Sequence, residues 1–221
     1  METTSTTGTT TPAPFALDID PRVLFSAATK TGTEVISALR PDQLDNPTPC
    51  TEYDVRDLLG HLVGVLDRVA VMGRGGNPMS VSTEVDDVAD DAWLAVWTAA
   101  AAEARLAWKD DAALTRTITL PWATDTGAAA LLGYVSEITV HTWDVAHATG
   151  QKPEWNDDAV GRALDLMRVW LPGEGRAEIF AEVNKKMGVD PSFGGPFAEL
   201  VPVPDDAPLI DRLVAWNGRR P

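Results

Sequence analysis

A chain of 221 residues, 44% hydrophobic and 23% charged, has the composition of a globular protein with one large domain. Its 33 acidic and 18 basic residues give a formal net charge of −15, so we expect it to bind neither nucleic acid nor an anionic membrane surface. No run of about 18 apolar residues occurs, which predicts that no helix spans a membrane. A single cysteine and an N-terminus without a basic start or an apolar run favour a cytoplasmic protein.

The N-terminal part of the chain predicts a tail and then a helix. Residues 1–16 are rich in Thr, Pro and Gly, and we expect them to be disordered. A helix is expected from about Pro21 to Leu39, with Asp20 as its N-cap. The apolar side of this helix is predicted to contain Val23, Leu24, Ala27, Val35 and Leu39.

A second helix is predicted to open at Asp54, after a loop whose three prolines prevent a continuous helix. Asp54 and Asp57 form a pair that resembles a capping box. The apolar stripe that follows consists of Val55, Leu58, Leu59, Leu62, Val65, Leu66 and Val69, and "GRGGNP" ends the helix.

Two further long helices are expected. The third runs from about Val85 to Lys109 and carries tryptophans and alanines at helical spacing. The alternating, β-branched stretch "LTRTITLPWATDTG" predicts an extended connection. The fourth helix is expected from about Gly127 to Ala148, with Gly150 as its stop.

The remainder predicts a helix from about Asp157 to Trp170, a possible short strand in "FAELVPVP", and a last helix near Pro208 to Trp216. Four long amphipathic helices favour a mainly α fold, an up-and-down four-helix bundle. We therefore expect a bundle over residues 17–150 and a C-terminal extension, 151–221, packed on it.

The stretch "SEITVHTWDVAHATGQ" places an ionisable pair inside an apolar run of the fourth helix. A buried carboxylate costs several kcal/mol unless a partner compensates its charge. Glu137 and His141 are four residues apart and lie about 40° apart around the helix, so they share one side. His61 lies at the edge of the second helix's apolar stripe, and the three residues can converge at one end of the core. His147 points to the far face.

Three donors of the types His, Glu and His suit a divalent metal of borderline softness, most naturally zinc. Three protein ligands leave a coordination position open, which is the catalytic rather than the structural arrangement. The alternative is an ordinary i, i+4 pair beside a satisfied core histidine.

Other residues have two interpretations each. Asp144 is either an orienting partner of a metal-bound histidine or a capping and surface residue. Tyr134 either faces the pocket or packs in the core, and Cys50 is either a nucleophile or a structural turn residue. Four arginines either bind a substrate carboxylate or are ordinary surface charges: Arg56, Arg68, Arg74 and Arg105.

The segments "TPCTEYDVRDLLGHLVG" and "EITVHTWDVAHATGQ" together resemble the DinB-like superfamily, in the branch of the mycothiol-dependent maleylpyruvate isomerase metal-binding domain. The ending "VPVPDDAPLIDRLVAWNGRRP" resembles the tail of small, uncharacterised, actinobacterial-type members of that branch. The resemblance implies a four-helix bundle whose divalent metal is held by His61, Glu137 and His141. It also implies a thiol cofactor, such as mycothiol or bacillithiol, whose sulfur the metal binds.

The expected function is thus a metal-dependent S-transferase or cis–trans isomerase that takes a small-molecule thiol and an electrophilic substrate, as a monomer or a homodimer. A metal-held water would instead give a hydrolase. The alternative is a protein that is not an enzyme: a bundle that binds a metal or a small molecule and has a regulatory or sequestering role. Relatives often carry Trp at Tyr53 and Gly at Thr142, and the chain lacks room for the isomerase's longer C-terminal domain. The family's substrate-binding arginines cannot be placed here by motif, so maleylpyruvate is not transferred as the substrate.

Overall fold

The computed structural model describes residues 15, 17–188 and 198–221. The tail predicted over 1–16 lies outside these residues except for Phe15, which packs, partly buried, against the core. No helix of the described part is long and apolar enough to cross a membrane.

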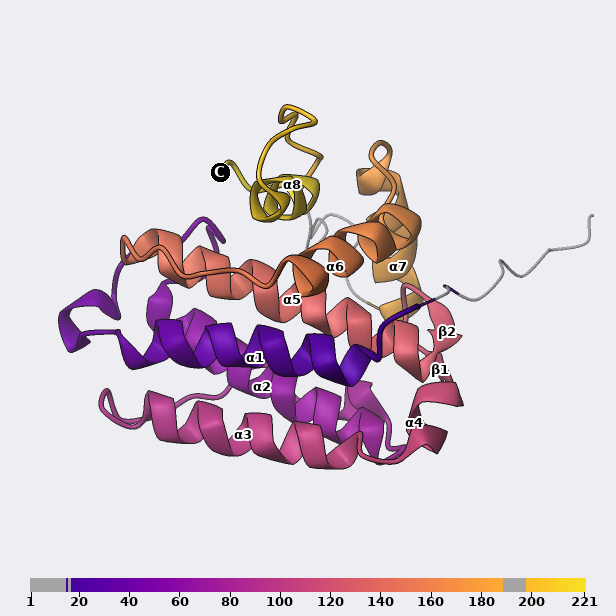
Figure 1. The fold of residues 1–221 in the computed structure, drawn as a ribbon, viewed down its shortest axis with the longest axis horizontal. Coiled ribbons are helices and arrows are strands. Elements are labelled where there is room, and N and C mark those ends of the chain that lie inside the picture. Colours follow the sequence, from indigo (N-terminus) through magenta and orange to yellow (C-terminus); the bar gives the residue numbers. More distant parts are fainter. Residues whose placement is uncertain (1–14, 16, 189–197) are drawn as a thin grey trace, which may run out of the picture.

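Four helices form the bundle: α1 (Pro21–Ser37), α2 (Val55–Gly73), α3 (Trp93–Ala107) and α5 (Gly127–Ala148). Each packs against two of the others, in the ring α1–α5–α2–α3, and their apolar sides enclose one core (Figure 1). The predicted mainly α four-helix bundle is therefore confirmed, but its helices do not simply alternate in direction as in an up-and-down bundle, because α2 and α3 run parallel.

Local capping explains where the bundle helices begin and end. Asp20 accepts a hydrogen bond from the Arg22 backbone N–H at the start of α1, and the Asp54–Asp57 capping box opens α2 as predicted. Thr126 caps α5 through the Ala129 N–H, and Gly150, with φ of 70°, follows its end. The bounds of α5 are the predicted ones.

The prediction that Val23 belongs to the apolar side of α1 is wrong. Val23 is 61% exposed, whereas Leu24 and Phe25 are buried. The buried positions of α1 recur at three- and four-residue spacing from Pro21 through Leu24, and Val23 falls outside that arc.

The third helix begins at Trp93 and not at Val85, because the chain needs residues 74–92 to return along α2. Helices α2 and α3 run parallel: Arg56 near the start of α2 pairs with Asp90, and Arg74 after its end pairs with Glu103. The connection contains the short 3-10 helix η2 (Pro78–Ser80), and Asp87 has a positive φ of 61°, which a helix does not allow.

Two glycines of α2 allow this return segment to lie directly on the helix. A Cβ on Gly60 would overlap the carbonyl oxygen of Val85, and one on Gly64 would lie 2.5 Å from the carbonyl carbon of Thr83. Arg68, one turn further on, donates to the Val81 carbonyl. The backbone of residues 81–85 therefore follows α2 in the opposite direction.

Short elements connect the long ones. The 3-10 helix η1 (Pro41–Gln43) lies between α1 and α2, and α4 (Asp111–Thr115) follows α3. The predicted extended connection is an antiparallel hairpin of β1 (Thr117–Thr119) and β2 (Thr124–Thr126), with Thr117 opposite Thr126.

The C-terminal part adds three helices: α6 (Asp157–Trp170), α7 (Arg176–Met187) and α8 (Leu209–Trp216). α6 packs on α5 and α1, and α8 packs on α6 and α5, on the side of the bundle opposite α3 (Figure 1). The sequence did not predict α7. Residues 198–204 form no strand, because Val201 donates to the Ala215 carbonyl at the end of α8 instead; Phe197, the start of the predicted strand, lies outside the described residues.

Replacing Gly60 by alanine should destabilise the protein by about 1–3 kcal/mol, because the added methyl group meets a backbone oxygen that cannot rotate away. The control is Gly161→Ala in α6, where the nearest atom to the new methyl group is 3.9 Å away and helix propensity favours alanine by up to about 1 kcal/mol. Denaturant unfolding of both variants measures the two free energies. Equal effects of the two substitutions would contradict the close packing of the return segment on α2.

Candidate metal centre

The structure brings His61, Glu137 and His141 together where α2 and α5 pack side by side. Oε1 of Glu137 lies 3.2 Å from Nε2 of His61 and 3.4 Å from Nε2 of His141. The two imidazole rings meet edge to face, with centroids 5.0 Å apart. One carboxylate oxygen thus joins the two helices through two imidazoles.

The three side chains are mostly enclosed. His61 retains 13% of its side-chain exposure, His141 9% and Glu137 25%. The ring of Tyr53 stacks on His61 with centroids 5.4 Å apart, and its hydroxyl lies 3.3 Å from a carboxylate oxygen of Glu84 in the return segment. Glu137 is therefore the most accessible of the three from solvent.

Charge compensation decides the protonation of this group. Burial opposes the ionisation of Glu137, but the charge and hydrogen bonds of His141, with those of His61, outweigh it and hold the pKa of Glu137 well below its ordinary value. Burial likewise opposes a charge on His141, but Glu137 and Asp144 outweigh it and raise the pKa of His141 to about 9. Without a metal, Glu137 and His141 form a hydrogen-bonded ion pair at neutral pH.

The donor atoms also fit a divalent cation. Two ligand atoms that are each about 2.1 Å from a tetrahedral zinc ion lie about 3.4 Å apart. The two distances from Glu137 agree with this value, and suitable donor atoms of all three residues lie within 4.8 Å of one another. Two imidazole nitrogens and a carboxylate oxygen are donors that zinc accepts.

Asp144 fixes the orientation of His141. Its Oδ2 lies 3.0 Å from Nδ1 of His141, so Nδ1 carries the proton and Nε2 faces Glu137. The Nδ1 atom of His61, by contrast, is buried without a hydrogen-bond partner among the described residues. The two imidazoles are thus held differently, one by a carboxylate and one by ring stacking.

Reasoning from the sequence missed Arg219, which is the partner of Asp144. Its Nη2 donates to Oδ2 of Asp144 at 3.0 Å, and its Nε lies 3.3 Å from both carboxylate oxygens. Asp144 is fully buried and the Arg219 side chain is 7% exposed. Arg219 is 75 residues from Asp144 and stands beside a second arginine, so no spacing rule singled it out.

Cys50 lies next to this group. A sulfur donor from Cys50, a nitrogen of His141 and a carboxylate oxygen of Asp144 lie within 4.8 Å of one another. Burial raises the pKa of the Cys50 thiol to about 11, with Asp144 and Glu137 acting in the same direction and Arg219 against it. The thiol is therefore protonated at neutral pH, which does not favour a nucleophile.

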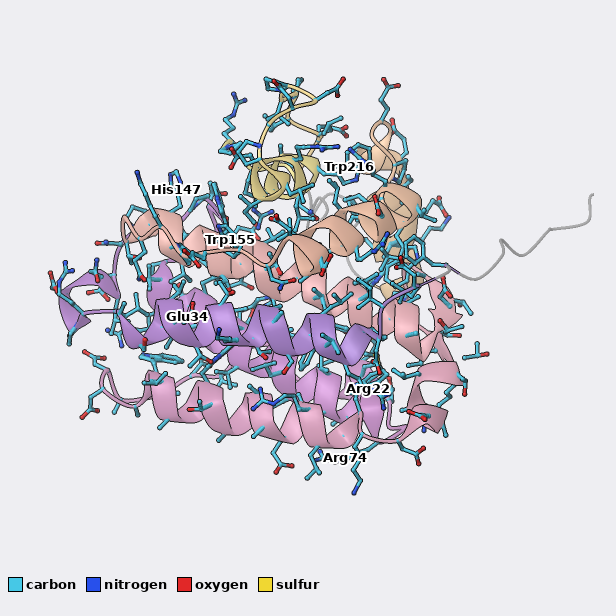
Figure 2. All side chains as sticks on the ribbon, viewed as in Figure 1. Arg22, Glu34, Arg74, His147, Trp155 and Trp216 are labelled. Atoms are coloured by element: carbon cyan, nitrogen blue, oxygen red, sulfur yellow. The ribbon has the colours of Figure 1, made fainter. Side chains whose placement is uncertain are left out.

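The other candidate residues are buried in the core, exposed to solvent or already paired. Tyr134 is 6% exposed, and burial raises its pKa to about 12. Three of the arginines pair with carboxylates or hydroxyls: Arg56 with Asp90, Arg74 with Glu103 and Arg105 with Thr29. His147 is exposed and lies against Trp143 at the outer edge of α5 (Figure 2).

A helical bundle that offers a His, Glu and His donor set between two of its helices has the arrangement expected of a DinB-like protein. Comparison with known families agrees. Residues 25–146, more than half of the chain, match the mycothiol maleylpyruvate isomerase N-terminal domain, and the chain belongs to that family.

The chain is also similar to individual proteins. It is 27% identical over 202 residues to two uncharacterised proteins from two strains of Mycobacterium tuberculosis, over 91% of this chain and 98% of each relative. A crystal structure of the mycothiol-dependent maleylpyruvate isomerase matches with a TM-score of 0.47 and 12% identity. That match spans 66% of this chain and 66% of the isomerase chain.

The stability of the metal-free protein should depend on pH through His141. Folding raises its pKa from 6.5 to about 9, so its contribution is complete below about pH 6.5 and is lost as the pH rises through 9. Glu137 acts in the opposite sense: its contribution is present above pH 4.5 and is lost as the pH falls through its lowered pKa.

We expect the free energy of unfolding, measured with urea in the presence of a chelator, to fall between pH 6.5 and about 9. His141→Gln should show a smaller fall over the same interval, because it has no proton to lose. The same slope in wild type and variant would contradict the assignment of this titration to His141.

Proposed function

We propose that this protein is a divalent-metal-dependent enzyme that uses a low-molecular-weight thiol of the mycothiol type, in an isomerisation or an S-transfer. The observation that carries the proposal is the donor set, in which one Glu137 oxygen lies 3.2 and 3.4 Å from the imidazole nitrogens of His61 and His141. The family name, which refers to a mycothiol-linked isomerase, supports the thiol.

His61, Glu137 and His141 would hold the metal, and zinc is the ion that this donor set suits best. A zinc ion held there would lower the pKa of a thiol from about 8.5, so that a thiolate nucleophile would be present at neutral pH. Three protein donors leave a coordination position free, and this favours a reactive role over a structural one.

The chain's own residues would shape how a thiol reaches the site. The stacked ring of Tyr53 covers His61, and Asp144 lies behind His141, so both imidazoles are closed on one side. Glu137 retains the largest exposure of the three donors, which favours approach from its side. The negative charge of Glu137, held ionised by its neighbours, would partly neutralise a dication and limit non-specific binding of anions.

The reaction classes follow from thiolate chemistry. A thiolate that adds to an activated double bond leaves a single bond free to rotate, and loss of the thiol then gives the isomer. A thiolate that displaces a leaving group gives S-transfer. Both classes need a small electrophilic substrate, and neither needs the protein to supply a second nucleophile, which agrees with the protonated thiol of Cys50.

The remaining parts of the proposal concern organisation. We propose that residues 17–150 form the metal-binding bundle and that residues 151–221 are an extension of it, since α6 and α8 both pack on α5. We also propose that the protein acts in the cytoplasm as a monomer or homodimer; its net charge of −15 does not favour a polyanionic partner.

Metal analysis tests the donor set. Untagged wild-type protein should bind one zinc ion per chain, because all three donors are in place. His61→Ala should lose most of the zinc, since a site with only three protein ligands needs each of them. The matched control is His147→Ala, which removes an exposed histidine of α5 and should keep the wild-type content. Equal zinc in all three proteins would contradict the assignment.

Thiol consumption tests the reaction. Zinc-loaded protein, supplied with mycothiol and a panel of activated alkenes and alkyl halides, should consume or isomerise at least one substrate faster than buffer does. Glu137→Gln, which keeps the size of the side chain but removes its charge, should reduce that rate by at least about tenfold through weaker metal binding. Full zinc occupancy without turnover on any substrate would favour the non-catalytic binding bundle instead.

A further inference from the structure

The C-terminal segment, defined as residues 209–221, places a buried cation behind the candidate metal centre. Oδ2 of Asp144 accepts from Nη2 of Arg219 at 3.0 Å and lies 3.0 Å from Nδ1 of His141. The same carboxylate oxygen therefore links the guanidinium to the imidazole. Nη1 of Arg219 donates to the Asn217 carbonyl, so the guanidinium is held at both ends.

The segment that carries Arg219 is itself firmly docked. Leu213, Val214 and Ala215 of α8 are fully buried, and the Trp216 indole N–H donates to the Leu171 carbonyl at 3.0 Å. The guanidinium of Arg168 on α6 lies 5.5 Å from the centroid of a Trp216 ring.

After α8 the chain turns at Gly218, which has a positive φ of 82° and touches Ala198. The Arg219 N–H then donates to the Val214 carbonyl. The direction of the Arg219 side chain is thus set by backbone contacts as well as by Asp144.

A second metal ion does not explain this group. Cys50, His141 and Asp144 could offer donors to a cation, but the guanidinium of Arg219 already neutralises Asp144. A dication beside it would be repelled by that charge, and Cys50 would have to lose a proton to bind. Arg219 is the cation that this carboxylate binds.

We propose that Arg219 is a positioning residue of the metal centre, and that docking of the C-terminal segment and metal binding at His61, Glu137 and His141 strengthen each other. This inference rests on the metal site of the proposed function. With Arg219 in place, Asp144 is held where it orients His141, so that Nε2 faces the metal position. Without Arg219, Asp144 loses the guanidinium that holds it in place and must move, so that His141 loses its fixed orientation. Coupling of this kind is reciprocal, so metal binding must in turn favour the docked segment.

Metal affinity tests the first half of the proposal. Arg219→Met should weaken zinc binding by about 10- to 100-fold, the range typical for groups that orient a metal ligand. Arg220→Met is the matched control: it removes the same charge from the adjacent, exposed position and should change the affinity by less than about twofold. Arg219→Lys keeps the charge but not the forked geometry, and should fall between the two.

A double-variant cycle shows whether Arg219 acts through Asp144. The pair Asp144→Asn with Arg219→Met leaves no buried charge unpaired and should bind zinc no more weakly than Asp144→Asn alone. Losses that multiply would show that Arg219 acts elsewhere and would overturn its positioning role.

Hydrogen exchange tests the reciprocal half. Zinc should slow the exchange of the α8 amides in wild type and in Arg220→Met, by a factor that matches the affinity lost in Arg219→Met. In Arg219→Met, zinc should leave that exchange unchanged. If Arg219→Met and Arg219→Lys bind zinc like wild type, or if zinc does not slow α8 in wild type, the coupling is refuted while the metal site stands. If wild type binds no zinc, the coupling and the proposed function fall together.

Discussion

The carboxylate of Glu137 lies between two imidazoles that come from different helices, and the arrangement of the whole site depends on this contact. An unpaired carboxylate at this depth would cost several kcal/mol. His141 supplies the larger part of the compensation from the same helix, and His61 adds to it from α2. The alignment of α2 and α5 is therefore favoured by charge as well as by apolar packing. The outer partners extend the same compensation: His141 is held by Asp144, and Asp144 by Arg219.

The path of the chain between α2 and α3 also helps to build the site. α2 and α3 run in the same direction, so residues 74–92 must travel back along α2 before α3 can start. Gly60 and Gly64 allow this at close range, and Glu84 in the return segment reaches the hydroxyl of Tyr53, whose ring covers His61. A connection that would otherwise be a surface loop thus contributes to the enclosure of the site.

Features set by neighbouring residues could be predicted from the sequence. The bounds of α5 depend on Thr126, Gly150 and an unbroken apolar pattern, and the Asp54–Asp57 box is a local signal. The proximity of Glu137 and His141 follows from helical spacing alone. That His61 lies beside them could be expected from its place at the edge of the stripe, although only packing brings it within bonding distance.

Features set by distant parts of the chain could not be predicted. The end of the return segment, from Val85, is predicted to be helical from the sequence. Its composition does not show that α2 and α3 are parallel, which is why the chain must return there in an extended form. Helix α7 has few buried positions among the described residues, so its sequence carries no clear apolar stripe. The glycines at both of its ends indicate where a helix could stop but do not predict one between them. Arg219 looked like one of two ordinary arginines after a helix, because its burial depends on where α8 docks. Each of these features needs the tertiary arrangement, which local propensity does not encode.

The close approach of the return segment to α2 has a consequence for how this site can diversify. The helix that carries His61 meets the return segment through main chain, because Gly60 and Gly64, on either side of His61 in the sequence, have no side chain to present. A side chain added at either glycine could not reshape the site unless the backbone itself moved. New substrate preferences would instead have to arise from replaceable side chains near the donors, such as Tyr53 on His61 and those around Glu137.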